Sequence, residues 1–170
     1  MRTALASVAL LAVGLAPGLA HAHLQFANSV DTSTNPGEIR FEDNTGYDDA
    51  RIWSIDRWNA VGKIVIAPDA WNTVADLEFQ TDSSDTGLCG KYIPYATIAD
   101  DIKYYKPSWD NYSTGKRRAC ALHELGHALS LAHNSDDKSQ AMDPCPVCLN
   151  PTYTTYPGDH DKKDYYSKWH

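Results

Sequence analysis

Apart from an apolar run near the beginning of the chain, the sequence has no long apolar run. After residue 22, no uncharged apolar segment approaches the 20 or so residues that span a bilayer, so we expect no membrane as partner. Within residues 1–22, Arg2 precedes an apolar run at 4–15, and Ala20-His21-Ala22 is a small-x-small cleavage sequence. We therefore predict a signal peptide at 1–22 and a secreted, extracellular product at 23–170.

Runs of basic residues are also absent. Without Arg2, 14 of the 15 Lys and Arg residues remain against 22 Asp and Glu residues, a net charge of −8. An acidic surface with no basic run argues against nucleic acid or an anionic membrane as partner. We see no internal repeat or low-complexity tract in 23–170, and its 148 residues suffice for one domain with a core. We expect a monomer.

Cysteine is scarce, and an even number in an exported chain indicates two disulfides. The four residues are Cys89, Cys120, Cys145 and Cys148. Three pairings are open, and the closeness of Cys145 to Cys148 favours Cys145–Cys148 with Cys89–Cys120. The alternative is a structural zinc site with four thiolate ligands. It is disfavoured because Cys89 and Cys120 are not a close pair and because export favours oxidation.

Apolar spacing and turn residues predict strands and helices in mixed order, which is typical of an α+β fold with helices covering a mostly open sheet. The predicted strands are 38–42, 63–67, 74–80, 91–98 and 102–105. Pro94 interrupts the strand at 91–98, which suits an edge strand. Asp48 is a suitable N-cap for a helix at 49–60, and Asp161 and Asp164 have capping-box spacing at the start of a last helix at 161–169.

Residues 117–134 contain His123, Glu124, His127 and His133 in the pattern H-E-x-x-H-x-x-x-x-x-H. On a helix that Ser113 or Thr114 caps, His123 and His127 lie one turn apart and can share a metal ion. His133 is too distant for the same helical face, so the chain must turn back after the helix. Three neutral nitrogens with one open position are typical of catalytic zinc. Glu124 lies beside the metal, where its carboxylate can take a proton from metal-bound water.

With the third histidine and Met142 in view, the chain resembles the metzincin zinc endopeptidases, and among them a compact, bacterial-type matrixin. The resemblance identifies Met142 with the methionine turn beneath the zinc ligands, and Pro144 with the proline that matrixins place two residues later. It implies a zincin-like, mostly parallel sheet of about five strands with an antiparallel edge strand, an active-site helix and a C-terminal helix. It also implies one catalytic zinc, Glu124 as general base and an extended peptide or protein substrate along 91–98.

Three positions depart from the family pattern. Ser130 stands where metzincins usually have a glycine in a positive-φ turn, at a cost on the order of 1 kcal/mol. Pro146 replaces a pocket-wall tyrosine of matrixins, so the specificity of the family does not carry over. No cysteine precedes Cys89, so latency through a propeptide thiol is not available.

Two other functions fit the same pattern: a zinc-bearing binding module without turnover, and a zinc hydrolase acting on something other than peptides. Calcium is a further candidate ligand, with oxygen donors in two short segments. These donors are Asp82, Asp85 and Gly87, and separately Asp43, Asn44 and Asp48. Neither segment matches the twelve-residue calcium loop, and solvated turns are the favoured interpretation.

Overall fold

The computed structural model describes residues 37–134, 141–144 and 156–169. The predicted signal peptide, Cys145, Cys148 and Pro146 lie outside the described residues. Among the residues described, no helix is both long and apolar enough to cross a membrane.

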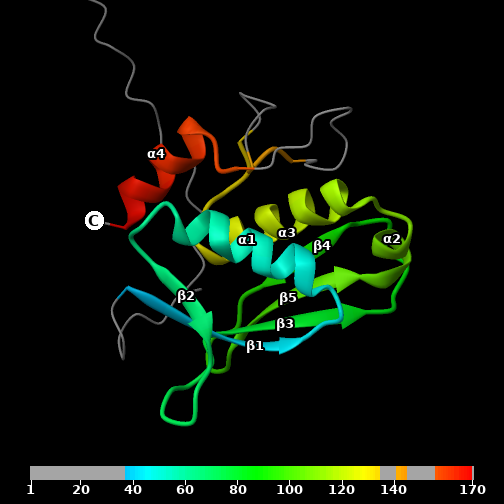
Figure 1. Ribbon diagram of the computed structural model, residues 1–170, viewed down its shortest axis with the longest axis horizontal. Helices are drawn as coiled ribbons and strands as arrows, with labels where there is room; N and C mark the ends of the chain where they lie inside the picture. Colours follow the sequence, from blue (N-terminus) through cyan, green and yellow to red (C-terminus); the bar gives the residue numbers. More distant parts are fainter. Residues whose placement is uncertain (1–36, 135–140, 145–155, 170) are drawn as a thin grey trace, which may run out of the picture.

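A five-stranded sheet in the order β2-β1-β3-β5-β4 forms the base of the domain (Figure 1). Its strands are β1 (Glu38–Asn44), β2 (Val65–Pro68), β3 (Leu77–Asp82), β4 (Gly90–Ile93) and β5 (Asp100–Tyr105). All neighbouring strands are parallel except β4, which pairs antiparallel with β5 and forms one edge. The predicted mostly parallel sheet with an antiparallel edge strand is confirmed.

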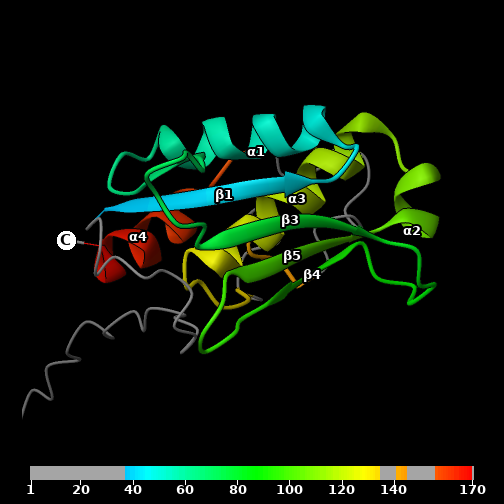
Figure 2. The same cartoon turned by 90° about the horizontal axis from the view of Figure 1, so that it is seen from below.

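Helices cover one face of this sheet (Figures 1 and 2). The two that lie over the sheet are α1 (Asp48–Asn59) and α3 (Thr114–Ala128). Helix α2 (Lys106–Asp110) follows β5 at one end of the sheet, and α4 (Asp159–Lys168) packs on α1 through Tyr165 and Trp58. Helix α3 contacts β4 and β5, and α1 packs beside α3 and contacts β2. The indole Nε1 of Trp58 on α1 donates to the carbonyl of Leu122 on α3 at 2.9 Å. The position of the motif helix α3 is therefore fixed both by the sheet and by the neighbouring helix α1.

Strand alternation explains the core. Ile39, Phe41, Leu77 and Phe79 are buried, while the residues between them are more exposed, so one sheet face is apolar and meets the helices. Helix α4 closes the core through Tyr165, whose ring stacks on Trp58 with centroids 5.9 Å apart. The Tyr165 hydroxyl accepts hydrogen bonds from the backbone amides of Lys63 and Ile64 at 3.1 and 2.7 Å. The last helix is thereby tied to the chain entering β2.

Several predicted boundaries need correction. The edge strand ends at Ile93, before Pro94, instead of reaching 98. Asp48 is the first residue of α1 rather than its cap, and its carboxylate pairs with Arg51 at 3.1 Å. Helix α2 was not predicted, because it has only 5 residues and begins around a proline. Helix α4 begins at Asp159, so Asp161 is its third residue and not its N-cap. The Asp161 carboxylate still belongs to the capping box, because it accepts a hydrogen bond from the amide of Gly158, the residue before the helix, at 2.8 Å.

Candidate metal centre and its buried carboxylate

The motif helix begins and ends through recognisable caps. Ser113 precedes α3, and its side chain accepts a hydrogen bond from the Lys116 amide at 3.4 Å, so Ser113 rather than Thr114 is the cap. At the other end, Ser130 has a φ of 68°. The Ser130 amide donates to the His127 carbonyl, and the Leu131 amide donates to the Gly126 carbonyl. This bond pair is a Schellman motif with serine at the position that usually holds glycine.

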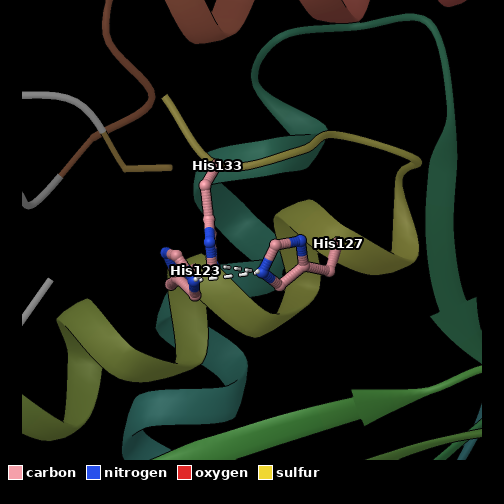
Figure 3. Close-up of side chains that lie close together, drawn as sticks. All are labelled: His123, His127 and His133. Atoms are coloured by element: carbon pink, nitrogen blue, oxygen red, sulfur yellow. Dashed lines mark hydrogen bonds between the residues drawn. The ribbon is translucent and has the colours of Figure 1, made fainter. Parts of the chain in front are cut away.

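The Schellman turn reverses the chain and returns His133 to the face of α3 that carries the other two histidines (Figure 3). The Nε2 atom of His123 lies 3.1 Å from that of His127 and 3.2 Å from that of His133. The Nε2 atoms of His127 and His133 are 3.2 Å apart. The Nε2 atoms of all three motif histidines therefore converge on one point. Their spacing can be compared with that of nitrogens bound to four-coordinate zinc.

Carbonyl groups fix the proton positions on two of these rings. His123 Nδ1 lies 2.8 Å from the carbonyl oxygen of Ala141, and His127 Nδ1 lies 2.8 Å from that of Leu131. Because a carbonyl only accepts, both Nδ1 atoms must carry the hydrogen, which leaves each Nε2 with a free lone pair. Such outer hydrogen bonds orient histidines that bind metals.

Burial keeps the rings neutral. It lowers the pKa of His123 to about 3 and that of His127 to about 4, and in both cases a neighbouring imidazole adds to the effect. Burial also lowers the pKa of the more exposed His133, and the Asp143 carboxylate opposes this. At most one proton, on His133, can therefore lie among the three Nε2 atoms. Two lone pairs facing each other at this distance repel, and a cation between them removes the repulsion.

Zinc fits this donor set. Nitrogens bound to tetrahedral zinc at about 2.0–2.1 Å lie about 3.3–3.4 Å from one another, close to the spacing of the three Nε2 atoms. Neutral imidazoles are also the ligands that zinc prefers, and three of them leave one coordination position open. His123, His127 and His133 thus form a group whose geometry is suited to holding a metal ion.

Glu124 lies on the side of α3 that faces the edge strand. Its side chain is 5% exposed, and its Oε2 accepts a hydrogen bond from the Tyr92 amide of β4 at 2.9 Å. Burial raises the pKa of Glu124 to about 7, and the Tyr92 amide opposes the rise by stabilising the charged form. A carboxyl group with a pKa near neutrality can both accept and return a proton at physiological pH.

The segment that contains Met142 lies against the other side of α3. Met142 is buried, and a Cβ added at Gly126 would stand 2.3 Å from its sulfur, so this glycine permits the close contact. The neighbouring Ala141 supplies the carbonyl that orients His123. Asp161 on α4 accepts hydrogen bonds from the amides of Ala141 and Met142 at 2.6 and 3.3 Å. The buried Asp161 carboxylate therefore joins α4 to the support of the histidines.

The remaining predicted site residues are the four cysteines and the calcium candidates. Cys89 and Cys120 form a disulfide with 6.1 Å between their Cα atoms, so these two sulfurs are not part of a four-thiolate zinc site. Cys145 and Cys148 are outside the described residues. Of the calcium candidates, Asp43 forms an ion pair with Arg51 at 2.6 Å.

Several groups at the site were not predicted from the sequence. The Ala141 and Leu131 carbonyls and the Tyr92 amide belong to the backbone and carry no residue-type signal. Asp161 was expected to act only within its own helix. Its contacts with residues 141–142 were missed, because these partners lie about twenty positions away in the sequence. Gly90, where an added Cβ would stand 2.7 Å from Cγ of Glu124, had a usable signal, since a glycine in a strand often marks a close approach of another group.

Comparison with known proteins adds information on the fold. No family model and no curated protein matches the sequence. A solved structure of the GM1-bound form of the ECX AB5 holotoxin is similar with 17% identity over 81% of this chain and 74% of that chain, at a TM-score of 0.49. The structure of myroilysin is similar with 9% identity over 78% of this chain and 91% of that chain, at a TM-score of 0.50. At this identity, the likeness to myroilysin concerns the fold alone.

Proposed function

We propose that this chain is a secreted, zinc-dependent endopeptidase of the metzincin type, most similar to a matrixin. The observation that carries the proposal is the convergence of three Nε2 atoms, with spacings of 3.1–3.2 Å. The buried Glu124 directly follows the first of these histidines on α3. A structural zinc site normally uses four protein ligands, whereas three histidines leave a position for water or substrate. The signal-peptide pattern at 1–22 and the Cys89–Cys120 disulfide support an extracellular location.

The roles of the residues follow from their surroundings. His123, His127 and His133 would hold the ion, and zinc supplies a Lewis acid that makes water more acidic and polarises a carbonyl. The Glu124 carboxylate accepts the proton of the attacking water and then delivers it to the leaving amine of the cleaved peptide. The Ala141 and Leu131 carbonyls keep the two helical imidazoles in the tautomer that leaves Nε2 free.

The substrate in this proposal is an extended peptide or protein segment. Strand β4 is a sheet edge, and it lies directly beside Glu124. A peptide that adds to this edge as a further strand is held by backbone hydrogen bonds, so it presents its peptide bonds in a regular, extended form. We propose that the enzyme acts as a monomer.

Peptide-library digestion of the secreted protein, read by mass spectrometry, tests the proposal. The zinc-loaded wild type is expected to cleave internal peptide bonds. The same protein with its metal removed by a chelator, and the variant Glu124→Gln, are expected to lose nearly all cleavage, about 100-fold or more, because neither can activate water. Zinc added back should restore the chelated wild type only.

Each alternative predicts a different result. A zinc-bearing binding module would bind one zinc ion and leave the whole library intact. A zinc hydrolase of another class would spare peptides and cleave members of a parallel panel of ester and non-peptide amide substrates. Cleavage that persists at the wild-type rate in Glu124→Gln would contradict the assigned role of the carboxylate.

A further inference from the structure

The Cys89–Cys120 disulfide lies against the catalytic carboxylate of the proposed enzyme. Cys120 lies one helical turn before Glu124 on α3, and Cys89 directly precedes β4. The sulfurs of the bridge and a carboxylate oxygen of Glu124 lie within 4.8 Å of one another. The covalent link between the motif helix and the edge strand is therefore made at the place where Glu124 meets that strand.

Gly90 makes this approach close. A Cβ added to Gly90 would stand 2.7 Å from Cγ of Glu124, 3.1 Å from the Lys103 carbonyl oxygen and 3.2 Å from the Cys120 sulfur. The φ of Gly90 is not in the left-handed region, so the position needs glycine for space and not for backbone conformation. Any larger residue there must displace the Glu124 side chain, because the backbone of β5 blocks the other direction.

The Tyr92 amide supplies the third contact. It donates to the Glu124 carboxylate at 2.9 Å, at a point where β4 pairs with β5. The Glu124 side chain is thus held by a hydrogen bond at its carboxylate, by packing at Cγ and by the neighbouring bridge. Strand β4 is itself fixed there, because the Trp109 indole donates to the Cys89 carbonyl at 2.6 Å.

We propose that the Cys89–Cys120 bridge, together with Gly90 and the Tyr92 amide, positions the Glu124 carboxylate for proton transfer, so that full activity requires the oxidised bridge. This inference rests on the proposed function. A disulfide that closes a long loop contributes to stability at any suitable place in a fold. The Cys89–Cys120 bridge also sets the distance between β4 and α3, and the Glu124 carboxylate lies between these two elements. Its effect on stability and its effect on the position of the carboxylate can be separated by experiment.

Gly90→Ala tests positioning while it leaves the bridge and the histidines in place. We expect its kcat to fall about 10- to 100-fold, because a displacement of about 1 Å can cost that much. Its KM should stay within twofold, and the protein should still bind one zinc ion. The matched control is Gly46→Ala, since a Cβ at Gly46 meets nothing within 4 Å. Its kcat and KM should equal those of the wild type.

The double variant Cys89→Ala/Cys120→Ala tests the bridge independently. Assayed below its unfolding temperature, it should show a kcat about 10-fold or more below the wild type, with KM and zinc content unchanged.

If one of the two variants does not fold, the other decides. A wild-type kcat in either folded variant would overturn the proposal, and so would loss of zinc, which would place the effect at the histidines. A wild type that cleaves no peptide would overturn the proposed function as well, whereas an active wild type with unaffected variants overturns the positioning role alone.

Discussion

At the residue scale, the histidines gain their metal-binding form from two backbone carbonyls. Hydrogen bonds of 2.8 Å place the hydrogen of His123 and of His127 on Nδ1, so the nitrogens that converge are the unprotonated ones. Both carbonyls belong to chain that follows the motif helix, Leu131 in its terminal turn and Ala141 ten residues later. The histidines are thus oriented by the segments that come after them in the sequence.

Ser130 stores backbone strain next to this arrangement. A non-glycine residue with positive φ costs on the order of 1 kcal/mol, and the Ser130 side chain is almost fully buried. We expect Ser130→Gly to be more stable than Ser130→Ala by about 1 kcal/mol, because both lose the hydroxyl and only alanine keeps the strain. Urea unfolding of the two variants measures the difference. Equal midpoints would mean that the turn relaxes without cost.

At the element scale, helix α4 supports the site through one carboxylate. Asp161 accepts hydrogen bonds from the Ala141 amide at 2.6 Å and the Gly158 amide at 2.8 Å, and it is 1% exposed. It therefore connects the start of α4 with the segment whose carbonyl orients His123.

Asp161→Asn should destabilise the protein by about 2–4 kcal/mol, because the new amide group turns a donor toward backbone donors in a buried place. Zinc affinity should fall with it, on the order of 10-fold or more, as for other outer-shell partners of metal ligands. The control is Asp159→Asn in the same helical turn, where the side chain is exposed and the expected change is within about 0.5–1 kcal/mol. Thermal unfolding and zinc competition with a coloured chelator measure both quantities. Equal losses in the two variants would contradict a specific role for Asp161.

The sequence predicted elements whose signals are local. The strand at 38–42 and the helix at 49–60 lie within two residues of β1 and α1, because apolar spacing and turn residues determine them. The spacing of His123 and His127 likewise needs only helical geometry. The predicted capping box was three positions too late, because the helix begins at Asp159 and Asp161 is the third residue of the box and not the cap. The further contacts of Asp161 with Ala141 and Met142 have no local signal, since the partners lie about twenty positions away. The short extent of β4 follows from Pro94, which ends the strand instead of lying within it.

At the scale of the whole molecule, the site joins parts that meet only on folding. The histidines come from α3 and the chain after it, the carboxylate is held by β4, and the support comes from α4. An unfolded chain does not bring these groups together, so the proposed zinc ion is expected to bind the native state far more tightly than the unfolded one.

Zinc should therefore raise the unfolding temperature. At a free zinc concentration about 100-fold above Kd, the native state gains about 2.7 kcal/mol, which corresponds to roughly 5–10 °C for a domain of this size. Scanning calorimetry with zinc and with a chelator measures the shift. The variant His123→Ala should show little of it, and an equal shift in that variant would place the zinc elsewhere.

The most direct test of the metal centre is the X-ray absorption spectrum, at the zinc edge, of protein loaded with one equivalent of zinc. We expect three imidazole nitrogens at about 2.0–2.1 Å from the zinc and one further light atom, with one imidazole fewer in His133→Ala. Fewer than three imidazoles in the wild type, or sulfur at about 2.3 Å, would contradict it.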